Sequence, residues 1–365
     1  MEIYVLDSGL NLVYITDEAS SVTWHRKYFE PGEFQVVTIL SQENLDAFKT
    51  GNFVWLHGQD EVGVIEHIEF RQEKDGSQSM MIVGSLATGL LRRRIILGTE
   101  YINDTVENAM RRIVNNHAVS PTDSARAIPS LVLGELKGYP ERIKYQVSYA
   151  NVCDELQRLG QLAGLGYRVL LDYDSKQLIF DVYKGVDRTA GQSVNSRAVF
   201  STDYENVLEQ TYIDSMRDYR NVAIVAGAGE GAERIIATVG TGSGLDRLEL
   251  YIDARDLQPI DEMGNPIPEP EYIELLVNRG LTKLAQYPLN RTYDANINVV
   301  SGNLVYRQDF DLGDLVTIKN DQWGVTIDTR ITEMEEVYEQ TGMDVYATFG
   351  NKLPTLIDKI RKAGR

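Results

Sequence analysis

The segment at residues 227–232 carries the clearest ligand-site signature in this sequence. It reads G-x-G-x-x-A and comes directly after an apolar run at 222–226. In a dinucleotide-binding fold such a loop opens a helix whose N-terminus faces a diphosphate. Here residues 235–239 are β-branched and predict a returning strand, and Glu230 and Glu233 would repel a diphosphate. We therefore predict a glycine-rich hairpin loop and no cofactor.

The histidines and serines lack the spacing that metal binding or nucleophilic catalysis requires. The four histidines are His25, His57, His67 and His117. No pair has the H-x-H or H-E-x-x-H spacing of a zinc site. Ser243 lies between two glycines, but Thr241 and Leu245 stand where the G-x-S-x-G nucleophile motif requires glycine. We predict neither a metal site nor a catalytic residue.

Three aspartates within residues 309–314 look like the start of a calcium loop. Gly313 falls one position early for an EF-hand, and no glutamate stands at position 12. A turn that enters a strand at 315–318 explains the same residues. Elsewhere, 54 acidic side chains make chance carboxylate pairs certain, so no glycosidase pair is identifiable.

Basic residues gather at three places on an acidic chain. With 36 basic against 54 acidic side chains, the formal net charge is −18, which disfavours phosphate-driven nucleic-acid binding. Local basic patches are either ordinary solvated faces or contacts with acidic surfaces of neighbouring molecules. The candidate assembly contacts are Arg92, Arg93, Arg94, Arg111, Arg112, Lys359, Arg361 and Lys362.

Residues 1–92 predict a first β-barrel-like domain. Short segments rich in β-branched and aromatic residues alternate with glycine, proline and aspartate breakers. The predicted strands are 3–6, 13–16, 22–28, 34–40, 53–57, 62–70 and 80–86, and a short helix is predicted at 41–49.

Residues 93–198 predict an α+β domain. Asp104 and Glu107 have the spacing of a capping box, and an amphipathic pattern follows over 106–114. Further predictions are a helix at 152–163, a hairpin formed by 167–173 and 177–183, and an exposed loop at 120–140. Cys153, the only cysteine, excludes an intramolecular disulfide and is predicted to be a core residue.

Residues 199–350 predict a second β-barrel-like domain with an acidic helical insert at about 245–290. The insert helix begins near Pro270. Its predicted apolar face consists of Ile273, Leu276, Val277, Leu281 and Leu284. The predicted strands are 221–226, 235–239, 295–300, 304–306, 314–318, 325–333 and 343–349. Residues 351–365 predict a basic C-terminal helix.

No secretory signal and no membrane-spanning stretch are visible in the sequence. We therefore expect a soluble protein made in a reducing cytoplasm, without membrane insertion.

An ordered series of short motifs in the second half resembles the ReqiPepy-type siphovirus tail protein family. The motifs are VYKGVDRT at 182–189, FS at 200–201, YEN at 204–206, YRNV at 219–222, GLDRLE at 244–249, DARD at 253–256 and YxxDxDLGDLV at 306–316, with the glycine-rich loop between the fourth and fifth. The resemblance extends over nearly the whole chain.

The resemblance implies a multidomain, β-rich α+β fold like that of phage baseplate hubs. Such hubs have two small β-barrel-like domains per copy, so a homotrimer has pseudo-sixfold symmetry and docks onto a hexameric tail tube. The expected partners are other copies of this chain and tail-tube, distal-tail or other baseplate proteins. The expected location is the virion tail, assembled in the bacterial cytoplasm, with DNA passing a central channel unbound.

Two functions remain open from the sequence. The first is a structural, non-enzymatic hub at the tail tip. The chain ends at Arg365 without a lysin extension, which favours this function. The alternative is a tail-associated cell-wall hydrolase or a carbohydrate-binding tip protein, suggested by the acidic clusters and the 20 tyrosines.

Overall fold

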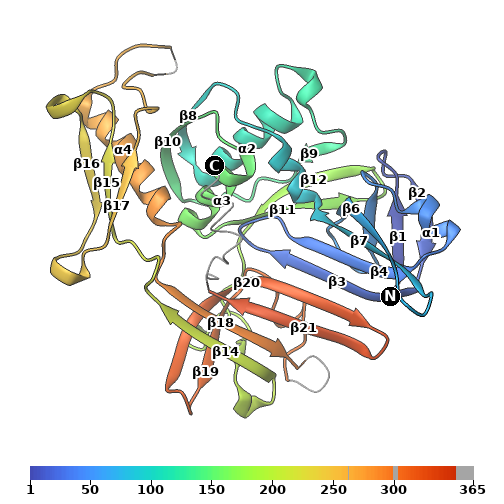
Figure 1. Cartoon of the computed structure of the whole chain (residues 1–365). Coiled ribbons are helices and arrows are strands. Elements are labelled where there is room, and N and C mark those ends of the chain that lie inside the picture. Colours follow the sequence, from blue (N-terminus) through green and yellow to red (C-terminus); the bar gives the residue numbers. More distant parts are fainter. Residues whose placement is uncertain (262, 299–302, 351–365) are drawn as a thin grey trace. The chain divides into compact units, whose positions relative to one another are not determined.

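The computed structural model describes residues 1–261, 263–298 and 303–350 and confirms a β-rich α+β fold with several sheets (Figure 1). The chain forms two compact units. The first comprises Met1–Lys184, Asn221–Gln286 and Glu335–Met343. The second comprises Gly185–Arg220, Tyr287–Met334 and the described residues from Asp344 onward. The predicted domain boundaries and the closure of the sheets into barrels stay predictions.

Seven antiparallel strands form the N-terminal sheet of the first unit, in the spatial order β3-β4-β7-β6-β5-β1-β2. They are β1 (Ile3–Leu6), β2 (Leu12–Thr16), β3 (Ala19–Lys27), β4 (Glu33–Ile39), β5 (Phe53–Leu56), β6 (Gly63–Gln72) and β7 (Gln78–Leu86). Burial alternates along β4, because successive side chains of a strand point to opposite faces. The sheet packs around Trp24 and Phe34. Helix α1 (Gln42–Ala47) is capped by the Ser41 hydroxyl. Each of the seven strands predicted for this region is confirmed.

A mixed α+β layer follows in the first unit. Its helices are the 3₁₀ helix η1 (Ala87–Arg93), α2 (Val106–Val114), the π-helix η2 (Asn115–Val119), the 3₁₀ helix η3 (Ser124–Arg126) and α3 (Val152–Ala163). Its strands are β8 (Thr99–Thr105), β9 (Leu131–Leu133), β10 (Arg142–Ser148), β11 (Gly166–Asp172) and β12 (Gln177–Tyr183). The predicted β11–β12 hairpin and Cys153 as a core residue are confirmed. The predicted loop at 120–140 contains η3 and the short strand β9.

The predicted cap of α2 is wrong. Thr105 is the N-cap, and its hydroxyl accepts the backbone N–H of Asn108 at 3.2 Å. Asp104 instead accepts hydrogen bonds from the Thr105 N–H and the Asn108 side chain. Glu107 binds a different segment of the chain and does not reach back to the cap. A capping-box spacing shows which side chains are available, whereas packing decides which of them is used.

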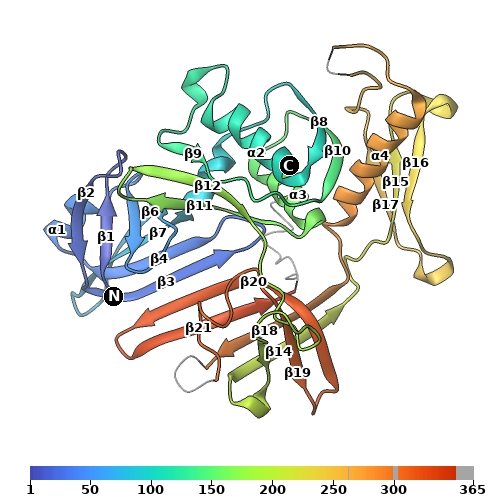
Figure 2. The ribbon, with the colours of Figure 1, turned by 180° about the vertical axis from the view of Figure 1, so that it is seen from behind.

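A smaller lobe lies at one edge of the first unit. Three strands pair in the order β16-β15-β17, and α4 (Glu269–Leu284) covers one face of their sheet (Figures 1 and 2). The strands are β15 (Val222–Ala226), β16 (Ile236–Gly240) and β17 (Glu249–Asp253). The antiparallel β15–β16 hairpin is confirmed. The sequence reading missed β17, which pairs in parallel with β15 from within the acidic insert.

The buried face of α4 matches the predicted one in part. Leu276 is buried as predicted, and Val277 and Leu284 pack against the same core. The prediction is wrong for Ile273 and Leu281, which are exposed, and it omitted the buried Tyr272 and Leu275. The helix begins as predicted, with a proline in its first turn and Glu269 at its first position.

The second unit is built from short sheets around aromatic side chains. Its strands are β13 (Val199–Phe200), β14 (Val207–Ser215), β18 (Asn290–Ile297), β19 (Leu315–Asn320) and the greater part of β20 (Val325–Glu339) and β21 (Gly342–Phe349). Phe200 packs between Phe310 and Phe349, with ring centroids 5.0 and 5.1 Å apart. The predicted strand at 304–306 is wrong, because Tyr306 forms only an isolated bridge beside a turn. The predicted C-terminal helix lies outside the described residues.

Candidate assembly surfaces

The arginine run at the end of η1 lies at the surface of the first unit. The apolar part of η1 is buried, and the chain leaves the core at Arg92 and Arg93. Arg93 forms an ion pair with Glu66, whose carboxylate lies 3.2 Å away. Arg94 donates a hydrogen bond from Nη1 to the Arg93 carbonyl at 3.0 Å. Arg93 is therefore held by a carboxylate, and Arg94 by a backbone carbonyl.

Arg126 of η3, which the sequence analysis did not single out, joins this run. Arg94 Nε donates a hydrogen bond to the Arg126 carbonyl, and Arg126 Nη2 donates one to the Ile95 carbonyl. Burial and the charges of Arg126 and Arg93 lower the pKa of the Arg94 guanidinium. Like charges have therefore been brought together, across about thirty residues of sequence, by hydrogen bonds to carbonyls.

Arg111 and Arg112, in the last turn of α2, belong to a second group. Arg111 donates to the Gly134 carbonyl at 2.7 Å, and Arg112 pairs with Glu100 at 2.9 Å. Glu100 also accepts hydrogen bonds from Asn116 and His117. Burial alone would raise the pKa of Glu100, but these hydrogen bonds and the charge of Arg112 lower it. Both arginines are used within the chain.

An open depression of about 490 Å³ lies beside this second group. Its polar lining includes Asn103, Asp104, Asn108, Arg111, Arg112 and Asn115. The remaining candidate contacts, Lys359, Arg361 and Lys362, lie outside the described residues.

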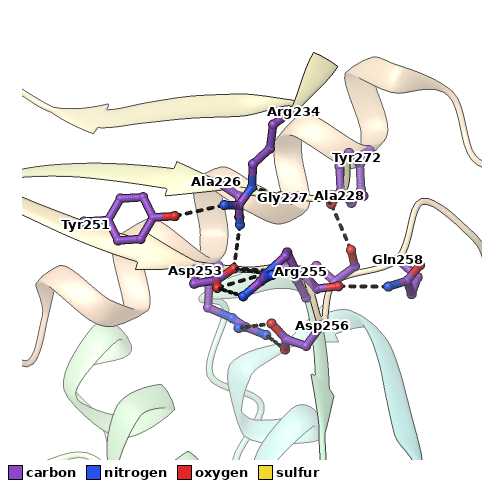
Figure 3. A network of polar contacts seen from close by, with 12 residues as sticks. Ala226, Gly227, Ala228, Arg234, Tyr251, Asp253, Arg255, Asp256, Gln258 and Tyr272 are labelled. Carbon is purple, nitrogen blue, oxygen red and sulfur yellow. Dashed lines mark hydrogen bonds and ion pairs between the residues drawn. The ribbon is translucent and has the colours of Figure 1, made fainter. Parts of the chain in front are cut away.

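The glycine-rich loop is a hairpin connection, as predicted. Gly227 follows β15, and a Cβ there would lie 2.5 Å from the Tyr272 hydroxyl of α4. That hydroxyl accepts the Ala228 N–H at 2.7 Å (Figure 3). Arg234 donates to the Ala226 and Gly227 carbonyls at 2.7 and 2.9 Å. The glycine thus allows close packing of α4 against the loop.

A charged network continues from this loop to the end of β17 (Figure 3). Asp253 binds Arg255 at 2.6 Å and also pairs with Arg234. The hydrogen bond from Arg255 is the main reason why the pKa of Asp253 falls to about 2. Asp256 pairs with Arg279 of α4 at 2.9 Å. The Asp253 pairs join the end of β17 to the glycine-rich hairpin, and the Asp256–Arg279 pair joins the segment after β17 to α4.

The aspartates at 309–314 shape a turn in the second unit. Asp314 accepts the Val186 N–H at 2.7 Å and pairs with Arg188 at 2.8 Å. Asp309 accepts the Val305 N–H at 2.8 Å. This confirms the interpretation of the segment as a turn that leads into β19.

Among the residues that the structure describes, no group of three histidine, cysteine or acidic side chains is placed to hold a metal ion. Within the same residues, no helix combines the length and the apolar character needed to cross a bilayer.

Comparison with known proteins supports a tail-protein fold. The family described as siphovirus ReqiPepy6 Gp37-like protein matches residues 2–351. No curated protein sequence matches the chain.

Three solved structures share the fold over nearly their whole length. A tail protein from Neisseria meningitidis MC58 is 13% identical with a TM-score of 0.56, and 96% of each chain is covered. The 43 kDa tail protein of prophage MuSo2 from Shewanella oneidensis is 14% identical with a TM-score of 0.57, covering 96% of this chain and 98% of that one. Prophage tail protein gp18 from Listeria monocytogenes EGD-e is 10% identical with a TM-score of 0.55, covering 100% and 98%.

Proposed function

Because the chain belongs to the siphovirus ReqiPepy6 Gp37-like family of tail proteins, we propose that it is the structural hub of a phage or prophage tail tip. Three copies form a ring that connects the tail tube to the distal tip. The observation that carries this proposal is the extent of the match. The family covers residues 2–351, and the fold is shared end to end with three tail proteins.

The two-unit architecture is consistent with this role. Each unit contains strands of its own and has its own packed side chains. A trimer of such chains presents six sheet-bearing units, which suits attachment to a hexameric tube. The closed symmetry of a ring also gives each contact the same geometry.

The net charge of −18 gives the proposed channel a physical purpose. A wall that DNA must pass should not displace the counterions of its phosphates, because that displacement drives non-specific binding. Acidic side chains along the channel would keep DNA moving. We assign no enzymatic step, because the acidic cluster at 309–314 shapes a turn.

The proposal places the chain in the virion tail after assembly in the bacterial cytoplasm. Its direct partners are other copies of itself, the tail-tube protein and a distal-tail or other baseplate protein.

Sedimentation velocity tests the ring directly. The chain has a mass of 41.1 kDa, so the proposal predicts a species of three times that mass, alone or with the tail-tube protein of the same phage. A chain that stays monomeric at every concentration, with and without the tube protein, would contradict it. Release of fragments from host peptidoglycan would instead favour a hydrolase.

A further inference from the structure

A polar pocket lies between α2 and β8 in the first unit. It is the open depression of about 490 Å³ beside Arg111 and Arg112, and small-molecule sites measure about 300–1,000 Å³. α2 contacts both β8 before it and η2 after it in the chain (Figures 1 and 2). All lining residues lie between positions 102 and 133, so the pocket is contained in the first unit and does not depend on the proposed ring.

One side of α2 and its C-cap supplies most of the polar lining. Four polar side chains recur there at intervals of three and four residues and so share one face: Asn108, Arg111, Arg112 and Asn115. The opposite side of α2 is apolar and buried in the core of the first unit. Because core packing fixes the rotation of the helix, this polar face is turned toward the pocket without rearrangement.

The helix continues past α2 in an irregular turn at the same place. η2 is a π-helix, and the Ser120 N–H donates to the Asn115 carbonyl at 2.7 Å. Its first two residues, Asn115 and Asn116, both line the pocket. π-helical turns are rare and occur frequently at functional sites. The irregular turn therefore coincides with the pocket wall.

The composition of the lining favours a polar ligand. Three of the lining residues are apolar, whereas four carboxamides, two guanidinium groups and one carboxylate supply the rest. An apolar ligand would take these polar groups out of water without replacing their hydrogen bonds, which is unfavourable. A carboxamide both donates and accepts hydrogen bonds, as a sugar hydroxyl does. Several carboxamides around one pocket therefore suit the neighbouring hydroxyl groups of a saccharide.

The carboxamides retain hydrogen-bonding capacity toward a ligand. The Asn103 side chain is exposed and has no hydrogen bond to another described residue. Asn108 donates through Nδ2 to Asp104 at 3.0 Å, and Asn115 donates through Nδ2 to the Asn116 side-chain oxygen at 3.2 Å. These two bonds fix the orientation of the amides, and the Oδ1 atoms of Asn108 and Asn115 remain as acceptors.

Arg111 brings a positive charge to the pocket that is not neutralised. Arg112 pairs with Glu100, whereas Arg111 donates to the neutral Gly134 carbonyl at 2.7 Å. Within the described part of the chain, no carboxylate lies at ion-pair distance from Arg111. A guanidinium has five N–H donors, of which this contact uses one. A half-buried arginine with donors to spare suits a carboxylate or a phosphate.

Asp104, the acidic residue of the lining, does not cancel the charge of Arg111. The hydrogen bond from the Asn108 side chain lowers the pKa of Asp104 most, and the charges of Arg142 and Arg112 lower it further. Asp104 is thus ionised, with its charge balanced by arginines other than Arg111. It accepts its hydrogen bonds through Oδ1, so Oδ2 remains to accept a ligand hydroxyl.

We propose that this pocket binds a saccharide that carries one anionic group, either a carboxylate or a phosphate. Arg111 binds the anionic group, while Asp104 and the asparagines bind the neighbouring hydroxyls. A local positive charge is what allows a chain of net charge −18 to receive an anionic ligand. Binding without cleavage is compatible with a structural hub. The site also differs from the acidic clusters that suggested carbohydrate binding from the sequence.

Saturation-transfer difference NMR on the full chain tests the pocket with matched probes. N-acetylmuramic acid carries a carboxylate and glucose-6-phosphate a phosphate, and N-acetylglucosamine and glucose are their neutral counterparts. At least one charged probe should bind at least about tenfold more tightly than its neutral counterpart, because its hydrogen bonds with Arg111 are charge-assisted. Absence of binding by both charged probes at about 10 mM would overturn the proposal.

Variants locate the binding within the chain. Arg111→Gln removes the charge but keeps a polar donor, so it should weaken the charged probe at least about tenfold and abolish its advantage over the neutral one. Asn103→Ala removes an exposed amide and should weaken the charged probe about threefold or more. Arg71→Gln is the control, because it removes the same charge from a side chain that is 61% exposed outside the pocket. It should leave binding unchanged, and circular dichroism checks that all variants fold.

The outcomes separate the pocket from the ring. Equal affinity for charged and neutral probes, or unchanged binding in both pocket variants, overturns the pocket. A trimer that binds no probe keeps the proposed hub and overturns the pocket. A chain that binds the charged probe through Arg111 but stays monomeric with and without tube protein keeps the pocket and overturns the hub.

Discussion

Removing the negative charge of Glu107 should loosen the loop before β10. Glu107 lies in the first turn of α2, and its side chain is fully buried. One carboxylate oxygen accepts the backbone N–H of Lys137 at 2.6 Å, and the other accepts those of Gly138 and Tyr139 at 2.8 and 2.9 Å. Three consecutive amides therefore depend on one buried anion. In Glu107→Gln, the carbonyl oxygen serves two of them at most, and the amide NH₂ faces the third.

The expected cost follows from these contacts. A hydrogen bond to a charged group contributes about 1.5–3 kcal/mol, and a buried unsatisfied N–H costs about 1–3 kcal/mol. We expect Glu107→Gln to lower the free energy of opening by about 2–4 kcal/mol, because one bond is lost and two become neutral. Since about 1.4 kcal/mol is a factor of ten, amide hydrogen exchange at 137–139 should accelerate roughly 30- to 700-fold.

Hydrogen–deuterium exchange read by mass spectrometry measures this effect locally. Glu135→Gln is the matched control, because it makes the same change in the same loop on a side chain that is 83% exposed. Glu135→Gln should alter the free energy of opening at 137–139 by less than about 0.5 kcal/mol. If Glu107→Gln also changed exchange at 137–139 by less than that amount, the buried carboxylate would not be what orders the loop.

Three further predictions concern packing, reactivity and pH. Gly227→Ala should cost about 1–3 kcal/mol in urea unfolding, because its Cβ would lie 2.5 Å from a tyrosine hydroxyl of α4. Gly231→Ala, in open space but at φ 55°, should cost only about 1 kcal/mol; the reverse order would refute the packing argument. Burial raises the pKa of Cys153 to about 12, so a thiol reagent at about pH 8 should modify it only after denaturation, and rapid reaction of the native chain would count against this. The pKa of Glu33 falls to about 2, chiefly through its hydrogen bond with His25. The ionised carboxylate therefore stabilises the folded chain above its ordinary pKa of 4.5, and this stabilisation is lost as the pH falls toward 2. Because the Glu33 side chain is 61% exposed, Glu33→Gln should make the acid-induced loss of unfolding free energy smaller by less than about 1 kcal/mol. An acid-unfolding curve identical to that of the wild type would exclude this contribution.

Local patterns in the sequence were sufficient for most strands. Alternation and flanking breakers located β1 to β7, and the run of β-branched residues after the glycine-rich loop correctly predicted β16 instead of a nucleotide-binding helix. These elements follow from neighbours in the sequence, so a reading of short windows finds them.

Features that depend on distant partners were not predictable in this way. β17 has acidic ends and lies in the acidic insert at about 245–290, but its parallel pairing with β15 buries Ile252. The packed face of α4 also includes Tyr272, which the apolar pattern did not indicate, because the Tyr272 hydroxyl accepts the Ala228 N–H of the glycine-rich loop and donates to the Leu257 carbonyl. In both cases the deciding contact comes from another part of the chain.

The candidate assembly surfaces also combine features that are visible in the sequence with features that depend on distant contacts. The charge run at 92–94 is visible in the sequence, whereas Arg126 joins it only through tertiary hydrogen bonds, from Arg94 to the Arg126 carbonyl and from Arg126 to the Ile95 carbonyl. Arg111 and Arg112 look like a second charge run, but tertiary contacts place them against Gly134 and Glu100. Composition identifies candidate charges, and the fold decides which of them remain available.

Electron microscopy of the purified chain bound to its tail-tube protein tests the central claim most directly. The account predicts a ring with threefold symmetry and a central opening at one end of the tube, with each copy contributing two sheet-bearing units. A single copy attached to the side of the tube, or a ring without a central opening, would contradict the hub.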